Sequence, residues 1–295
     1  MRQIRTDLAM EAHKLWQESA ETTTELPGVR ALTRQHRGLD VTTVQILDHA
    51  GEQALGKPAG TYITLELEPQ RLRESAYPQR AAQALAGQLR RLLHLRPGQS
   101  VLVVGLGNAA VTPDAVGPRV LEYLLVTRHL QMDALRPVSA LSPGVLGATG
   151  LESAEIVRGV VERVRPARVV VADALVSRDP NRMCSTVQLA DTGIVPGSGV
   201  SNSRAAFNAE TLGVPVVAVG VPTVVEARTL CADLLEQAGA LGRLPDSLLP
   251  APGLMVTPRD VDSAMTRIAA LVGTAINQAL HSNLSPAELQ SLTGG

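Results

Sequence analysis

Two aspartates follow apolar runs that have the composition of buried strands. Asp114 comes a few residues after VLVVGLG (101–107), and Asp173 lies near the end of RVVVADAL (168–175). Because ligands of an open parallel sheet bind beyond the carboxyl ends of its strands, the two carboxyls could share one crevice. Burial raises a carboxyl pKa, and a neighbouring carboxylate raises one member of a pair further. One aspartate could then activate a water as general base while the other donates a proton, which is peptide hydrolysis without serine, cysteine or metal.

Each aspartate, taken alone, also has an ordinary structural interpretation. Thr112 suits a helix N-cap and Pro113 the first helical position, so Asp114 would fall in a first helical turn. The helix dipole would stabilise its charge there. Asp173 could cap a loop or pair with Arg178. Local sequence favours these interpretations for each residue, and only the pair favours catalysis.

Other catalytic and binding motifs are weaker. GLGNAA (105–110) loosely matches a dinucleotide-binding pattern, in which a helix begins at the glycines. Here Thr112-Pro113 indicates that the helix begins only after the glycines, which disfavours nucleotide binding. PGSGVSNS (196–203) lacks the Lys and Ser/Thr ending of a phosphate-binding loop and is expected to be a turn. The six histidines show no HxH or HExxH spacing, and no GxSxG occurs. A zinc peptidase and a serine triad are therefore disfavoured, and we expect no cofactor and no metal.

The composition argues against several classes of partner. Lys and Arg total 27, Asp and Glu total 28, and aromatic residues make up only 2%. This balance gives no overall attraction to DNA or to an anionic membrane, and a stacking surface for single-stranded nucleic acid is not expected. Residues 1–20 show no signal peptide, and no apolar run approaches ~18 residues, so we expect a cytoplasmic protein.

The two cysteines, Cys184 and Cys231, are too few for a disulfide framework and form no CxxC pair. In a reducing compartment both are expected to remain thiols and to serve as small buried residues. A Cys–His nucleophile pair stays open as an alternative.

The order of apolar runs and helical segments predicts an α/β fold, with a mainly parallel, doubly wound sheet flanked by helices. The expected strands are 101–107, 168–175 and 214–222, and the expected helices are about 114–126, 152–165, 204–212, 223–238 and 259–281. A core built from Val, Leu, Ile and Ala suits such a buried sheet.

The first hundred residues follow a different pattern. A helix is expected over 8–20, and another over 78–94. Between them, 41–47 and 61–67 alternate in polarity and predict two antiparallel strands, an N-terminal β-hairpin insertion. We expect a single domain over 8–283 and a polar, loosely attached tail over 284–295.

Eight segments, in order, resemble the germination protease family of spore-forming bacteria. They are IRTDLAMEA (4–12), ALGKPAGTYITLELE (54–68), VGLGNAAVTPDAVGP (104–118), SPGVLGATGLESAEIV (142–157), VVVADALVSR (169–178), DTGIVPGSGVSNSR (191–204), GVPTVVEARTL (220–230) and MVTPRDVD (255–262). No single string decides the resemblance, which rests on the order of all eight along nearly the whole chain.

The resemblance implies an α/β fold similar to that of hydrogenase maturation proteases and an oligomer, usually a tetramer. It implies an endopeptidase of the forespore and spore core that degrades small acid-soluble proteins coating the DNA of dormant spores. By motif position, the catalytic pair of this family falls on Asp114 and Asp173. An inhibitory propeptide, removed during spore maturation, is also implied.

The propeptide is expected to be residues 1–7. Thr6-Asp7 followed by Leu8-Ala9-Met10-Glu11 has the form of the sites that this family cleaves, which predicts self-cleavage between Asp7 and Leu8. Alternatively, Thr6 and Asp7 simply cap the helix that begins near Leu8. The leader is shorter than the resemblance leads us to expect.

Two further departures concern single residues, and two other functions stay open. Ser201 stands where the family pattern has glycine, and Ala148 stands where it has a polar residue. The alternatives are a hydrogenase-maturation-like peptidase, which the absence of a histidine near the strand-end motifs disfavours, and a catalytically silent oligomeric binding protein on the same scaffold.

Overall fold

The structure is a computed structural model that describes residues 6–19, 26–74, 76–130, 132, 135–197, 204–239, 250–251 and 253–293. Its strands are β1 (Val29–His36), β2 (Leu39–Ile46), β3 (Gly60–Glu66), β4 (Val101–Gly105), β5 (Val138–Leu141), β6 (Arg168–Ser177), β7 (Thr186–Ala190), β8 (Val216–Glu226) and β9 (Met255–Val256).

The α-helices are α1 (Ala9–Ser19), α2 (His49–Leu55), α3 (Tyr77–Leu93), α4 (Val116–Glu122), α5 (Leu146–Thr149), α6 (Ser153–Val164), α7 (Ala209–Leu212), α8 (Ala227–Gln237), α9 (Val261–Leu280) and α10 (Pro286–Leu292). Three short 3-10 turns are η1 (Arg71–Arg73), η2 (Thr112–Asp114) and η3 (Pro180–Arg182). Within the described part of the chain, no helix combines the length and apolar character that a membrane crossing requires.

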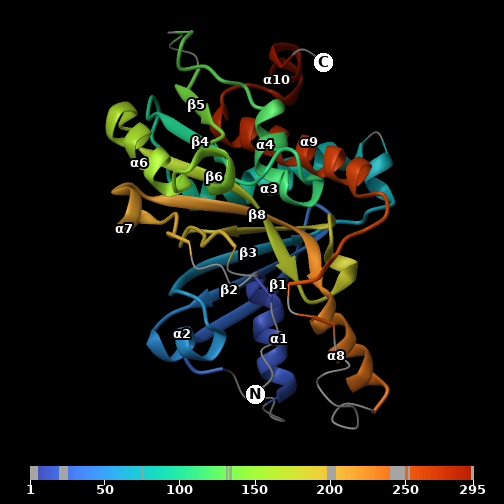
Figure 1. Cartoon of the computed structure of the whole chain (residues 1–295). Helices are drawn as coiled ribbons and strands as arrows, with labels where there is room; N and C mark the ends of the chain where they lie inside the picture. The colour runs from blue at the N-terminus through green and yellow to red at the C-terminus, as the bar shows by residue number, and fades with distance from the viewer. Residues whose placement is uncertain are drawn as a thin grey trace.

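One mixed sheet runs through the molecule in the order β1-β2-β3-β7-β8-β6-β4-β5, with β9 on β8 (Figure 1). The strands β5, β4, β6 and β8 are parallel, as the alternation of apolar runs and helices predicts. From β8 to β1 every neighbouring pair is antiparallel. The α/β prediction is confirmed, but the parallel part is only half of the sheet.

The predicted hairpin is present but is not a separate insertion. Strands β2 and β3 pair antiparallel, as expected, and α2 lies in their connection. Because β3 also pairs with β7, the hairpin extends the main sheet. The sequence analysis missed β1, whose residues after Val29 are all exposed and therefore lack the apolar alternation of a half-buried strand.

Helices cover both faces of the sheet. Val103, Val170 and Val219 face a core that also contains the buried sides of α3, α4 and α9, which lie together in Figure 1. Val169 and Val171 face the opposite side, where they pack against α6 and α7. On the antiparallel half, a third cluster joins α1 and α2 to β2 and β3.

Several predicted boundaries move once the sheet is complete. Strand β8 continues to Glu226 where a helix was expected from 223, because Val221 and Val225 are fully buried β-branched residues. The helix expected over 204–212 is only α7. The tail expected to be loosely attached contains α10, whose Leu289 is buried and whose Ser285 and Glu288 form a capping box.

The end of β4 crosses the start of α4 at two glycines. A Cβ on Gly105 would lie 2.4 Å from the Gly117 carbonyl oxygen, and a Cβ on Gly117 would lie 2.3 Å from the Leu106 nitrogen and 2.6 Å from the Ala172 carbonyl oxygen. These contacts are backbone atoms, which cannot swing aside as side chains do. The close approach brings the loop between β4 and α4 against β6.

Gly117→Ala should therefore lower the free energy of unfolding by about 1–3 kcal/mol, the usual cost of overpacking. The matched control is Gly159→Ala in α6, where an added Cβ meets nothing within 4 Å. Removing a helical glycine there should raise the unfolding free energy by about 0.5–1 kcal/mol. Urea unfolding of both variants measures the difference, and equal stabilities would contradict the glycine crossing.

Candidate active site

Asp173 lies inside β6 rather than at its end. Ala172 is the last β6 residue paired with β4, and Asp173 is the next residue, opposite Gly220 of β8. Its side chain is only 5% exposed, and its Oδ1 accepts a hydrogen bond of 2.9 Å from the Ala174 N–H. The pairing with Arg178 considered above does not occur, because that guanidinium binds Asp233 at 2.7 Å.

Asp114 lies in the 3-10 turn η2 rather than in the first turn of an α-helix. Its Oδ2 accepts a 2.8 Å hydrogen bond from the Asn108 N–H, and the Thr223 hydroxyl donates to the Pro113 carbonyl at 2.6 Å. Gly107 has φ of +110°, and a Cβ there would lie 1.9 Å from the Asp114 carbonyl oxygen. The loop is thus folded tightly enough that Asp114 turns back toward β4.

The two carboxyls line one cavity of about 450 Å³, as their positions after β4 and within β6 predicted. Arg204 and Asp7 line the same cavity. The rest of the lining is mostly apolar, with Leu106, Val145, Leu175, Phe207 and Met255 among its residues. A mainly apolar cavity with a few converging polar groups is the usual form of a small binding or catalytic site.

Burial raises the pKa of both aspartates above that of an exposed carboxyl. It raises the pKa of Asp173 to about 8, with the Asp114 charge as the second cause and Asp7 adding to it. Burial also raises the pKa of Asp114, against a hydrogen bond from Asn108 and the charge of Arg204, both of which lower it. Near neutral pH Asp173 therefore holds a proton while the less buried Asp114 is the member that ionises first.

Asp7 lies beside β6 in the region that β4 does not reach. The Asp7 N–H donates to the Val176 carbonyl at 2.9 Å, and the Val176 N–H donates to the Asp7 carboxylate at 2.8 Å. The next residues, Leu8 and Ala9, are fully buried. Asp7, which lines the cavity of the two aspartates, is thus followed at once by buried residues that do not line it.

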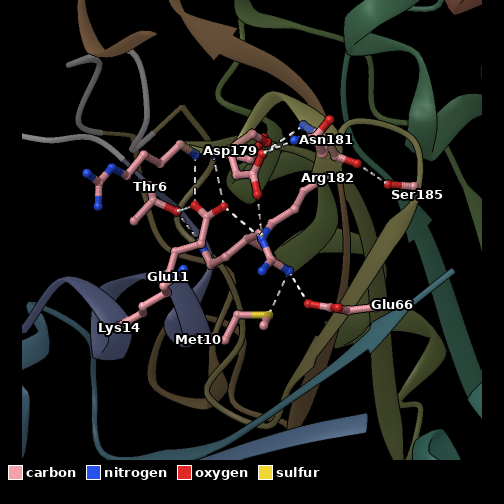
Figure 2. Close-up of polar contacts among 12 residues, drawn as sticks. Thr6, Met10, Glu11, Lys14, Glu66, Asp179, Asn181, Arg182 and Ser185 are labelled. Carbon is pink, nitrogen blue, oxygen red and sulfur yellow. Dashed lines mark hydrogen bonds and ion pairs between the residues drawn. The ribbon is translucent and has the colours of Figure 1, made fainter. Parts of the chain in front are cut away.

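The chain after this bond is anchored through Glu11 (Figure 2). The buried Glu11 carboxylate accepts hydrogen bonds from the backbone N–H groups of Arg178 at 2.7 Å and Asp179 at 3.1 Å. Arg182 lies 3.1 Å from it and also pairs with Glu66. Thr6 donates to Glu11 and accepts from the Leu8 N–H at 3.0 Å. Because α1 begins at Ala9, whose N–H donates to Gln188, this Thr6 contact lies just before the helix and is not a cap on a helical N–H.

Three polar residues at the site were missed by the sequence analysis. Among the described residues that line the cavity, Arg204 carries a positive charge, and this charge lowers the pKa of both aspartates. Lys57 and Gln188 contact the Asp7 carbonyl from 50 and 181 residues away along the chain. None of the three has a spacing that marks a known catalytic motif, although Lys57 lies in the segment ALGKPAGTYITLELE and Arg204 closes DTGIVPGSGVSNSR.

The other candidates from the sequence lie apart from the cavity or outside the described residues. Cys184 is buried, burial raises its pKa to about 11, and Cys231 is half-buried. Among the described residues, no cysteine and no histidine lines the cavity. Ala148 lies exposed in α5, and Ser201 lies outside the described residues. Pro196 and Gly197, expected in a plain turn, line the cavity.

Comparison with known proteins identifies the family of the chain. The sequence model of the germination protease family matches residues 9–242. The chain belongs to the germination protease family. A germination protease of Caldanaerobacter subterraneus is 42% identical over 98% of both chains. Those of Clostridium tetani and Bacillus cytotoxicus are 39% and 36% identical, over 98% and 94% of both chains. Membership in this family makes the chain a peptidase, as its segments predicted.

One solved structure is similar at a lower level. A [NiFe] hydrogenase maturation protease from Thermococcus kodakarensis is 16% identical, matches 64% of this chain and 98% of its own, and has a TM-score of 0.36. At that score the likeness supports no conclusion about fold or function.

The raised pKa of Asp173 makes stability depend on pH. The unfolded carboxyl titrates near pKa ~3.9, whereas the folded one titrates at about 8, so between these values folding takes up a proton. The wild-type free energy of unfolding should therefore fall as pH rises from about 4 to 8, and this fall should be smaller in Asp173→Asn. Relative to wild type, the variant should gain several kcal/mol over that range, since one pKa unit corresponds to about 1.4 kcal/mol.

Urea unfolding at several pH values measures this effect, and Asp40→Asn, at an exposed site on β2, is the control. The control should follow the wild-type pH dependence throughout. Parallel curves for wild type and Asp173→Asn would mean that the Asp173 carboxyl is ionised in the folded protein at neutral pH.

Proposed function

We propose that this chain is an endopeptidase that initiates the degradation of small acid-soluble spore proteins during germination. Family membership supports peptide hydrolysis. The observation that carries the mechanism is a pair of aspartates with unequal burial in one cavity. On this basis the enzyme is an atypical aspartic-type peptidase, with no cofactor and no metal assigned to the reaction.

In the proposed reaction Asp114 is the base and Asp173 the acid. Ionised Asp114 takes a proton from a water in the cavity as the water oxygen bonds to the substrate carbonyl carbon. Protonated Asp173 gives its proton to the amide nitrogen as the carbon–nitrogen bond breaks. The products are a carboxyl and an amino terminus, and proton transfer from Asp114 to Asp173 through solvent restores the starting state.

The enzyme is proposed to be made as a zymogen that cleaves itself between Asp7 and Leu8. The contacts of Asp7 with Val176 and its place in the lining of the cavity support this site. A tethered segment occupies a cleft at high effective concentration, so it blocks other peptides without needing strong contacts. Release of residues 1–7 would then open the β6 edge to substrates.

The setting of the enzyme follows from the family resemblance. Small acid-soluble proteins in the spore core are the proposed substrates, and a homotetramer in the forespore and spore cytoplasm is the proposed form. The exposed outer strand β1, with Leu32 half-exposed, offers one surface for assembly. The proposal includes no direct contact with nucleic acid or membrane.

Asp114→Asn and Asp173→Asn should each lower the turnover of a small acid-soluble spore protein by roughly 10²–10⁴-fold, the usual contribution of one acid–base group. Asp40→Asn, an exposed carboxylate far along the sheet, should retain wild-type turnover. In the wild type, turnover should decline at alkaline pH as Asp173 loses its proton, and this decline should set in below pH 8 because the active form no longer carries the charge of Asp7. Near-normal activity in either active-site variant, with the fold intact by circular dichroism, refutes the paired-acid mechanism.

Self-cleavage gives a second, independent measurement. N-terminal sequencing of the active enzyme should begin at Leu8, and the Asp173→Asn protein should keep residues 1–7 in place. Full activity of a chain that still carries Met1 would show that the leader does not inhibit, even if the catalytic pair is correct.

A further inference from the structure

The carbonyl oxygen of Asp7 accepts hydrogen bonds from two side chains. The Lys57 ammonium donates at 2.9 Å, and the Gln188 amide nitrogen donates at 3.1 Å. Lys57 lies in the connection between α2 and β3, and Gln188 lies on β7, so two separate elements converge on one backbone oxygen. This oxygen belongs to the peptide bond that the proposed self-cleavage breaks.

Gln188 holds this peptide bond on both sides. Its Oε1 accepts a 2.8 Å hydrogen bond from the Ala9 N–H, while its Nε2 donates to Asp7 before the bond. Because the acceptor end of the amide is fixed by Ala9, the donor end must face the Asp7 carbonyl. The side chain is buried, which strengthens both hydrogen bonds relative to water.

Lys57 is an unusual residue for this chain. The sequence has only two lysines among its 27 basic side chains, and the other, Lys14, is well exposed on α1. Burial lowers the pKa of Lys57, while the charges of Asp7 and Glu11 raise it. An ammonium is a compact point charge, which suits a single oxygen better than the planar fork of arginine.

Asp7 is shared by the two donors, which contact its carbonyl oxygen, and by the cavity that holds the two aspartates. Asp7 lines the cavity with Asp114 and Asp173, whereas Lys57 and Gln188 do not line it. Catalysis by these donors requires that a water in the cavity reach the Asp7 carbonyl carbon while Lys57 and Gln188 hold its oxygen. Fixed donors on the oxygen that becomes charged are among the largest sources of catalytic stabilisation.

We propose that Lys57 and Gln188 are catalytic donors that stabilise the oxyanion formed at the carbonyl before the cleaved bond. As the water oxygen bonds to the carbon, the π electrons move onto the carbonyl oxygen, where the ammonium and the amide N–H bind the negative charge. When the carbon–nitrogen bond breaks, these electrons re-form the carbonyl, and Asp173 protonates the departing nitrogen. This inference rests on the proposed self-cleavage between Asp7 and Leu8.

The test follows self-cleavage of the full chain after it is refolded from denaturant. Cleavage within one molecule has no binding step, so a rate constant that is independent of protein concentration reports the chemical step. Lys57→Met should lower it by roughly 10²–10³-fold, as expected for loss of one oxyanion donor. Gln188→Glu keeps the acceptor for the Ala9 N–H but replaces the donor with a carboxylate, and should lower it similarly. Lys14→Met is the matched control and should cleave at the wild-type rate.

Hydrogen exchange separates catalysis from anchoring. The Val176 and Ala9 amides should stay protected in Lys57→Met, because their own partners, Asp7 and Gln188, are unchanged. The pH dependence of the residual rate should keep its wild-type shape, since the two aspartates remain. If Lys57→Met lost both the amide protection and the cleavage, Lys57 would only hold the segment in place, and its catalytic role would be overturned.

The remaining outcomes distinguish this inference from the proposed function. If wild type is cut between Asp7 and Leu8 and both donor variants are cut equally fast, the oxyanion inference fails alone. If wild type is not cut there, the proposed self-cleavage fails and the inference falls with it. Should Lys57→Met not fold, Gln188→Glu carries the same test, because its shape matches the native residue.

Discussion

The end of β4 at Gly105 leaves the last residues of β6 with an open edge. The crossing of Gly105 and Gly117 stops β4, while β6 continues to Ser177 with β8 on its other side. Backbone groups on the open edge of β6 need partners, and an extended chain is the simplest source of them. Asp7 supplies such partners to Val176. On the side where β4 has ended, Asp173 has no neighbouring strand, and its carboxyl lines the cavity.

The acids of this cavity act on one another because they share a dry site. Asp173 is the most deeply buried, and both Asp114 and Asp7 raise its pKa, while Arg204 opposes them. Departure of a segment that carries Asp7 would remove one of the negative charges. The proton on Asp173 would then be held less firmly, which couples loss of the leader to the acid strength of the site.

The sequence predicted the two aspartates better than it predicted their setting. Both follow Val-rich parallel strands, and the rule that ligands bind beyond such strands depends only on local pattern. The 3-10 turn of Asp114 could not be foreseen, because Gly107 and Thr223 impose it through contacts across the fold. Strand β1 lacks an apolar face, so its sequence does not show a half-buried strand. The place of β7 in the sheet depends on its pairing with β3 and β8, which are distant in the sequence. Lys57 and Gln188 reach the Asp7 carbonyl from distant parts of the chain, and local sequence does not predict which distant residues meet.

The anchoring of the N-terminal segment is unequal on the two sides of the Asp7–Leu8 bond. On the far side, Leu8 and Ala9 are fully buried, and Glu11 has two backbone donors and Arg182. Moving the Glu11 carboxylate out of this site would cost free energy, because Arg182 would lose its buried ion pair and the two backbone N–H groups would lose their acceptor. On the near side, the described contacts of Asp7 are hydrogen bonds to Val176, Lys57 and Gln188. Before cleavage the two sides hold the bond in place together. In the proposed self-cleavage the helix side would keep these buried contacts, whereas the described contacts of the released side are the hydrogen bonds of Asp7 and those of Thr6 with Glu11 and Leu8, so the helix side is held more firmly.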